Sequence, residues 1–379
     1  MILIGSLGMP GWAQEPAPVA PAAPPPQPAQ PAPTQPPRPE SPSQAPAQAP
    51  KFATPGADGI VPLPHVEKRG TGPIAMVLIA DAGCDWAAFD TFIERNKERY
   101  TLYAVNLPGF GGSLPPPPAK KPGEWLDNAA KAVWLSIVEL KLDKPVIVGH
   151  SLGGHIALRV GIAHSNDLRG IVVLDGVPTF PGKAGETPAE RTARAAKMRE
   201  SLEKATNDEW DLLQQRNASL WVAHPERAMV IGAMFMLHPR ESTIGYLEDL
   251  LLVDIRDDLP KLAAPTLVIA ALTPGLPADK APTSKQQIRD LFTKAPTAKV
   301  VFFDNSRHFV HEDQPAAVDA AIEKFLKGEP VEDFHGPAPV VPPRKRMPPP
   351  IPPALKPPAL IPTEPAKEGS GEPSVAPPK

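Results

Sequence analysis

The sequence predicts an α/β fold in which a mainly parallel sheet carries helices on both faces. Short, wholly apolar segments alternate with longer segments whose apolar residues have helical spacing, first over residues 74–176 and again over residues 264–328. Strands that are apolar along their whole length are typical of parallel sheets, which are buried on both faces. The stretch of about 270 residues between two proline-rich ends is long enough for one large domain.

The expected elements follow from these patterns in chain order. The first part should alternate strand and helix, beginning and ending with a strand, over residues 74–80, 87–99, 100–107, 124–142, 145–148, 152–165 and 168–174. The alternation then stops, because residues from about 180 to 258 have only helical spacing. We expect this region to be a helical lid inserted between two strands, with its Met and aromatic residues forming the lid's own core. The last part should run strand, helix, strand, helix, over residues 264–272, 285–295, 298–306 and 314–328.

Both ends of the chain differ in composition from the middle. Most of the 56 prolines lie in residues 14–58 and 331–379, where apolar periodicity is absent. Such segments cannot bury enough apolar surface to offset the entropy of ordering, so we expect disordered tails with polyproline II character around a domain at 59–330. The tails are either spacers or contact sites for the cell envelope or a protein partner, and composition does not choose between these roles.

Charge and hydropathy exclude some classes of protein. A net charge of −3 gives no support for nucleic-acid binding, and no apolar run reaches the length of a membrane span. Residues 1–13 are apolar and end with small residues, Gly11 and Ala13, as at a signal-peptidase site. We therefore expect an exported protein, periplasmic or secreted. A single cysteine, Cys84, excludes a disulfide within the chain.

A serine between two glycines marks the point where a predicted strand turns into a predicted helix. Ser151 is flanked by Gly149 and Gly153 in the pattern G-x-S-x-G. Small neighbours allow the sharp, strained turn that lifts a nucleophilic hydroxyl above a sheet, and the following helix points its free N–H groups at the site. The five-residue pattern alone recurs by chance, but its position between strand and helix is what the chemistry requires.

With this segment the chain resembles the α/β-hydrolase fold family. "NLPGFGGS" (106–113) is similar to that family's turn after its fourth strand, "GHSLGG" (149–154) to its nucleophile elbow, and "SRHFVHEDQPAAVDAAIEKFL" (306–326) to its final segment. The resemblance implies that Ser151 is the nucleophile. It also implies that His308 is the general base, because a serine hydroxyl needs an adjacent base to attack a carbonyl. The other histidines near the motifs, His150, His155 and His311, are expected to be structural.

The acidic member of the expected triad is where the chain departs from the family pattern. Pro274 stands near the position where the family often has an aspartate, and the first acid after it is Asp279. A known variation of the family places the acid after the strand that follows the elbow helix, where this chain has Asp175. We favour Asp175, with Asp279 as the alternative. A third interpretation is that Asp175 only caps its loop and no acid is present.

The resemblance also implies an oxyanion hole made of two backbone N–H groups. One should belong to Leu152, directly after the nucleophile. The other should come from the loop after the first strand, where Ala82 is the first choice and Gly83 the second. Asp81 replaces a glycine that is usual in this loop, which puts the loop's shape in question. Cys84 nearby is expected to be a small buried hydrophobic residue.

Together these residues predict a serine hydrolase that cleaves a carboxylic ester of a small-molecule acyl substrate through an acyl-enzyme, with no cofactor or metal. The alternatives are a lactonase, amidase or acyltransferase of the same fold, or a non-catalytic binding module in which the proline-rich tails are the working parts. The intact Ser151 and His308 argue against the binding module.

Overall fold

A computed structural model describes the middle of the chain, namely residues 64–116, 119–183, 185–277, 279–337 and 339. The predicted signal peptide at 1–13, the linker at 14–58 and nearly all of the C-terminal tail lie outside the described residues. Among the described helices, none combines the length and the apolar character needed to cross a bilayer.

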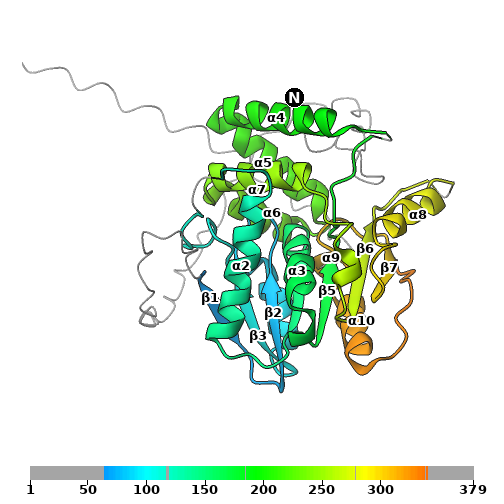
Figure 1. Ribbon diagram of the computed structural model, residues 1–379. Helices are drawn as coiled ribbons and strands as arrows, with labels where there is room; N and C mark the ends of the chain where they lie inside the picture. The colour runs from blue at the N-terminus through cyan, green and yellow to red at the C-terminus, as the bar shows by residue number, and fades with distance from the viewer. Residues whose placement is uncertain (1–63, 117–118, 184, 278, 338, 340–379) are drawn as a thin grey trace, which may run out of the picture. The chain divides into compact units, whose positions relative to one another are not determined.

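The described residues form one sheet of seven strands in the order β1-β3-β2-β4-β5-β6-β7 (Figure 1). The strands are β1 (Val66–Arg69), β2 (Ile74–Ile79), β3 (Tyr100–Val105), β4 (Val146–His150), β5 (Gly170–Leu174), β6 (Thr266–Leu272) and β7 (Ala298–Asp304). All neighbours pair in parallel except β1, which pairs antiparallel with β3. The mainly parallel sheet confirms the predicted fold class. The sequence patterns missed β1, because four polar or half-exposed residues at a sheet edge carry no apolar signal.

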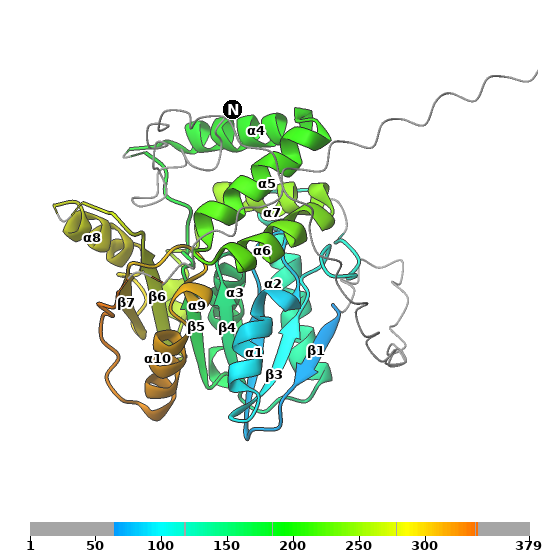
Figure 2. The same cartoon turned by 180° about the vertical axis from the view of Figure 1, so that it is seen from behind.

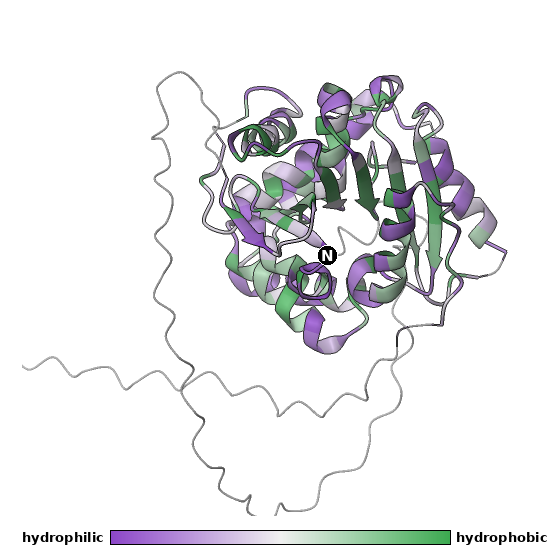
Figure 3. Ribbon diagram, turned by 90° about the horizontal axis from the view of Figure 1, so that it is seen from below, coloured by the Kyte–Doolittle hydropathy of each residue, from purple (hydrophilic) through white to green (hydrophobic). Residues whose placement is uncertain are grey.

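Helices cover both faces of the sheet, as expected. The helices α2 (Glu124–Glu139) and α3 (Leu152–His164) lie on one face, and α1 (Asp90–Asn96) and α10 (Pro315–Lys327) lie on the other (Figures 1 and 2). The remaining helices outside the lid are α8 (Ala281–Leu291) and the single turn α9 (Val310–Asp313). The view from below shows largely hydrophobic strands between helices that contain both hydrophilic and hydrophobic residues (Figure 3).

The core lies in two layers, one on each side of the sheet. Along β2, Met76 and Leu78 pack into one layer while Val77 and Ile79 pack into the other, and all four are at most 1% exposed. Successive side chains of a strand point to opposite faces. The wholly apolar strands in the sequence are therefore the direct consequence of a sheet that is buried on both sides.

The helical insertion forms four helices above the carboxyl ends of the strands: α4 (Pro188–Lys204), α5 (Asn207–Trp221), α6 (Pro225–Leu237) and α7 (Arg240–Leu252). Thr187 and Thr206 begin α4 and α5 with capping boxes, each threonine paired with a glutamate three residues later. Asp249 of α7 accepts hydrogen bonds from the backbone N–H groups of Gly123 and Trp125 at the start of α2. This contact ties the insertion to the sheet layer below.

The folded part extends beyond the predicted boundary at residue 330. Val331 is 4% exposed, and Phe334 forms a backbone bridge with Phe303 of β7 and stacks near its ring. Asp333 accepts a hydrogen bond from the Phe302 N–H and pairs with Lys285 of α8. Residues 331–334, which we assigned to the proline-rich tail, thus pack beside β7 at the edge of the sheet. The proline-rich composition begins only after these contacts.

A chain shortened to end at Gly328 should therefore be less stable than one ending at Pro339. Loss of the buried Val331 and of the Phe334 contact should lower the free energy of unfolding by about 2–4 kcal/mol, measured by urea denaturation. As a matched control, Phe334→Ala in the full chain should reproduce part of this loss. Equal stability of the two shortened chains would show that residues 329–339 do not belong to the folded unit.

Candidate active site

Ser151 stands on the sharp turn between β4 and α3, where its backbone has φ +52° and ψ −112°. This conformation is rare for a residue other than glycine and is held by hydrogen bonds on both sides. The Ser151 N–H donates to the Leu174 carbonyl at 2.9 Å, and its own carbonyl accepts from His155 in the first turn of α3. The strain places the serine side chain above the carboxyl edge of the sheet, facing the lid.

The glycines of the motif are required by close backbone contacts. A side chain at Gly153 would collide with the carbonyl group of Ile79 in β2, and one at Gly149 would collide with the Gly153 backbone. At Gly154 it would lie within 2.9 Å of the Val173 side chain. The glycines thus allow α3 to start directly against β2 and β5. That contact brings the loop after β2 beside Ser151.

His308 and Asp175 are joined by a hydrogen bond of 2.7 Å between Nδ1 and Oδ2. Asp175 directly follows β5 with φ +47°, and its other carboxylate oxygen accepts from the Ala271 N–H of β6 at 2.9 Å. Both side chains are buried. The structure therefore brings the favoured acid to the expected base, whereas Asp279 is exposed in the loop after β6.

The loop that carries His308 is anchored by the lid. The Phe309 N–H donates to the carbonyl of Trp221, the last residue of α5, at 3.0 Å. Asp313 accepts hydrogen bonds from the N–H groups of Ala223 and Arg307, each at 2.8 Å. The Trp221 ring lies edge-on to the His308 ring, with centroids 5.3 Å apart. The position of the histidine thus depends on contacts from a segment more than 80 residues earlier in the chain.

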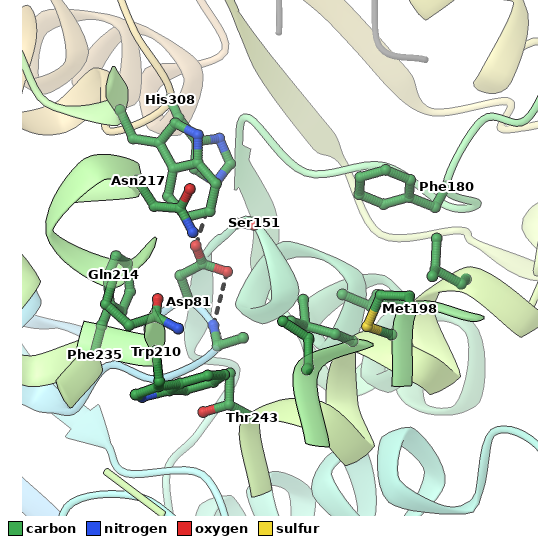
Figure 4. A pocket seen from close by; sticks show the side chains of 16 residues that line it. Asp81, Ser151, Phe180, Met198, Trp210, Gln214, Asn217, Phe235, Thr243 and His308 are labelled. Carbon is green, nitrogen blue, oxygen red and sulfur yellow. Dashed lines mark hydrogen bonds and ion pairs between the residues drawn. The ribbon is translucent and has the colours of Figure 1, made fainter. Parts of the chain in front are cut away.

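The two predicted oxyanion donors converge on one point. The N–H groups of Ala82 and Leu152 both donate to Oδ1 of Asp81, at 2.7 and 3.3 Å. Figure 4 shows the Asp81 carboxylate within the pocket. Gly83, the second choice, instead directs its carbonyl oxygen to His238 Nδ1 at 2.8 Å. Two backbone donors that share one acceptor are what an oxyanion hole needs.

Asp81 is the site residue that sequence reasoning missed. We noted it only as a replaced glycine that affects the loop's shape, but its buried side chain enters the site. Its second oxygen lies 3.3 Å from Nε2 of His308. The signal was present in the sequence, because Asp81 lies two residues after β2 and directly precedes the expected oxyanion donor, Ala82.

The ionisable groups of the site have strongly shifted pKa values. Burial would raise the pKa of Asp81, but the hydrogen bond and charge of His308 hold it at about 2. Burial would lower the pKa of His308, but hydrogen bonds to Asp175 and Asp81 raise it to about 9. The two carboxylates beside the ring therefore favour the protonated form of His308.

The three histidines that we expected to be structural are buried. Burial lowers the pKa of His150 and of His155 to about 3 and that of His311 well below its usual value, so all three are neutral at physiological pH. His150 Nε2 lies 3.0 Å from the His308 carbonyl oxygen, and His311 stacks on Phe89. None of the three rings lines the pocket described below.

A pocket beneath the lid is lined by Ser151, His308 and Asp81 together with residues of the lid (Figure 4). Its lining is mostly apolar and consists of Asp81, Ala82, Ser151, Phe180, Met198, Leu202, Trp210, Gln214, Asn217, Trp221, Phe235, Thr243, Leu247, Leu250, Leu251 and His308. The four from α5 (Trp210, Gln214, Asn217 and Trp221) follow one another at steps of four, three and four residues, which places them on one face of that helix. Trp210 packs in the lid's own core, as expected, and also lines this pocket. Trp221 and Phe235 line the pocket too but pack against the main core, which the expectation did not include.

Comparisons with known proteins agree with this geometry. The profile of the Alpha/beta hydrolase family matches residues 76–321. A pimeloyl-[acyl-carrier protein] methyl ester esterase of Vibrio vulnificus is 26% identical over 250 residues, 64% of this chain and 90% of that protein. The corresponding esterase of Aeromonas hydrophila is 24% identical over 273 residues, 69% of this chain and 98% of that protein.

Solved structures are similar in fold at lower identity. MenH from S. aureus superposes with a TM-score of 0.57 at 17% identity, covering 70% of this chain and 98% of that one. A thermophilic esterase from Thermogutta terrifontis gives a TM-score of 0.56 at 20% identity, covering 70% and 93%. Because the profile matches most of the described domain, the chain belongs to the Alpha/beta hydrolase family and is a hydrolase.

Proposed function

We infer that the protein is a carboxylic-ester hydrolase in which Ser151, His308 and Asp175 form the catalytic triad. One observation carries this proposal: Ser151, on its strained turn, lines the same pocket as His308, whose Nδ1 is hydrogen-bonded to Asp175. Beside them the backbone N–H groups of Ala82 and Leu152 converge on one acceptor oxygen. Each part supplies one requirement of acyl transfer, namely a nucleophile, an oriented base and stabilisation of the oxyanion.

The reaction would proceed in two balanced halves. In the first, Nε2 of neutral His308 takes the hydroxyl proton of Ser151 while Oγ bonds to the acyl carbon. The carbon–oxygen bond to the alcohol then breaks, and the imidazolium returns its proton to the leaving oxygen. In the second half, water attacks the acyl-enzyme with His308 again as base, which releases the acid and restores Ser151. Asp175 holds the Nδ1 proton throughout and stabilises the imidazolium.

The pocket supports a mainly apolar acyl or alcohol group with one polar substituent. Most lining side chains are apolar, but Asn217 Nδ2 and Thr243 Oγ1 are buried and have no hydrogen-bond partner among the described residues. Unpaired buried polar groups carry a desolvation penalty that a polar substrate group can relieve. The pimeloyl esterases match this chain at only 24–26% identity, so they support an ester substrate without identifying it.

Labelling with a fluorophosphonate probe tests the proposal, followed by a panel of p-nitrophenyl esters, an anilide and a lactone. We expect labelling and turnover of the esters, with the anilide and the lactone cleaved more slowly. Preferential cleavage of the lactone or the anilide would assign the enzyme to the lactonases or amidases, and the absence of labelling by any active-site serine probe would contradict the triad.

Export to the periplasm or the medium is part of the same proposal and rests on the first 13 residues alone. Fractionation of cells that produce the full chain, with the mass of the product, tests it. We expect a protein shortened at its N-terminus outside the cytoplasm. An uncut chain in the cytoplasm would contradict export.

A further inference from the structure

The carboxylate of Asp81 occupies the place where a substrate's carbonyl oxygen must go. Oδ1 accepts the two N–H groups of Ala82 and Leu152, and Oδ2 faces Nε2 of His308 at 3.3 Å. The side chain is 7% exposed, so it is enclosed in the site (Figure 4). The Asp81 carboxylate thus has one oxygen at the two N–H groups and the other at His308. A carboxylic acid product bound in the site would place its two oxygens in the same way.

Occupation by Asp81 and stabilisation of an oxyanion exclude each other. The two N–H groups cannot serve the side-chain oxygen and a substrate oxygen at once, and a carboxylate beside the acyl carbon would repel the charge that develops there. A hydrogen bond from the Ser151 hydroxyl contributes to the low pKa of Asp81, so the nucleophile also interacts with this carboxylate. In this arrangement nucleophile, base and oxyanion donors all contact Asp81 in place of a substrate.

Asp81 also holds His308 in its protonated form. The titratable groups that face the ring are Asp175 after β5, Asp81 after β2 and His150 at the end of β4, and Trp221 of the lid is uncharged. His150 is neutral at physiological pH, so two negative charges surround the His308 ring. Because an imidazolium cannot take the Ser151 proton, His308 must lose its Nε2 proton before acyl transfer begins.

We propose that Asp81 is an internal occupant of the oxyanion hole, and that an ester reacts only after its carbonyl has displaced this carboxylate. Asp81 therefore determines the reactivity of the enzyme: it lowers the rate of acyl transfer and moves the working range to higher pH. The proposal rests on the proposed function for the reaction affected, but the occupation of the anion position by Asp81 can be tested without that reaction.

The first experiment compares Asp81→Ala with the wild type in fluorophosphonate labelling rate and in kcat/KM for p-nitrophenyl acetate and hexanoate. Each oxyanion donor is worth about 10²–10³ in rate, so freeing the hole should raise both quantities about 10- to 1,000-fold at pH 7. The factor should be equal for the two esters, because the cost of displacing Asp81 does not depend on acyl length. Rates that are unchanged or lower in Asp81→Ala would overturn the proposal.

The pH profile gives an independent signature. In the wild type, kcat/KM should rise as pH increases through about 9, because only the neutral His308 is a base and its pKa is raised to about 9. Removing one of the two carboxylates lowers that pKa, so the rise should occur at lower pH in Asp81→Ala. An identical midpoint in both proteins would show that Asp81 does not hold the proton on His308.

Two further variants control for misfolding of Asp81→Ala and for the loss of a negative charge from this loop. Asp81→Asn keeps the shape of the side chain, so it serves if Asp81→Ala fails to fold. It should give a smaller increase in rate, because its amide oxygen can still accept from the two N–H groups. Asp85→Asn removes a charge from the same loop, where the carboxylate instead accepts from the Ala87 N–H and faces His238. Its labelling rate should stay close to that of the wild type.

Binding of hexanoate tests the occupation of the anion position by Asp81 independently of whether Ser151 is the nucleophile. In a Ser151→Ala background, calorimetry should detect hexanoate at least tenfold more tightly bound after Asp81→Ala, because the free carboxylate replaces the missing one on the two N–H groups. Equal hexanoate affinity with and without Asp81 would overturn the proposal, whatever the labelling results. Tighter binding together with labelling that persists in Ser151→Ala would instead overturn only the proposed nucleophile.

Discussion

Replacement of Ser151 by alanine should abolish ester hydrolysis and fluorophosphonate labelling. Removal of the nucleophile from a comparable triad lowers turnover by roughly 10⁶-fold, and no other serine or threonine of this site stands at the start of a helix beside His308. The fold should survive, because the turn is held by backbone hydrogen bonds from the Ser151 N–H and carbonyl, which alanine retains. Turnover of p-nitrophenyl hexanoate and the melting temperature are the measurements.

The activity of Ser151→Ala must be compared with that of a control variant in which the turn at Ser151 is unchanged. Thr243→Val removes a hydroxyl of α7 from the lining of the same pocket without changing the turn at Ser151. It should alter KM more than kcat. If Ser151→Ala turned over the ester as fast as the wild type, the hydroxyl of Ser151 would not be the nucleophile, and the motif would be a structural turn only.

Replacement of Asp175 by asparagine should lower turnover by roughly two to four decades, since the same change in a serine protease costs on the order of 10⁴. The carboxylate accepts the Nδ1 proton of His308 at 2.7 Å, whereas an asparagine could present its amide N–H₂ and favour the wrong tautomer. The backbone hydrogen bond of Asp175 to the Ile269 carbonyl is unaffected. The melting temperature should therefore change little.

Asp279→Asn is the matched control for the triad acid. Asp279 is exposed in the loop after β6, so its replacement should leave kcat within about twofold of the wild type. Loss of activity in Asp279→Asn together with full activity in Asp175→Asn would move the acid to the later loop. It would also mean that Asp175 only caps its own turn.

Much of the fold could be predicted because it depends on local patterns. The strands are apolar throughout since both faces of the sheet are covered, and the helices have apolar residues at helical spacing. The edge strand Val66–Arg69 was missed because only the pairing partner, β3, makes it a strand. The packed segment Val331–Pro337 was missed because its few apolar residues look like the start of a tail until β7 lies beside them.

The site was predictable to the extent that its residues stand on recognisable motifs. Ser151 and His308 were identified from the turn and from the final segment, and the N–H groups of Ala82 and Leu152 from their positions in the order of loops. The choice between Asp175 and Asp279 could not be made from spacing. It depends on which strand end reaches His308, and the contact that decides this joins residues 133 positions apart in the chain.

The sequence by itself determined the alternation of strands and helices, the glycine-dependent turn at Ser151 and the membership of a hydrolase family, because each depends on residues close together in the chain. Only the tertiary structure decided that the Asp81 side chain accepts hydrogen bonds from the Ala82 and Leu152 N–H groups. Its carboxylate meets Leu152 and His308, which lie 71 and 227 positions later. The Asp81 side chain takes its direction from these distant partners, and no local pattern around Asp81 records them.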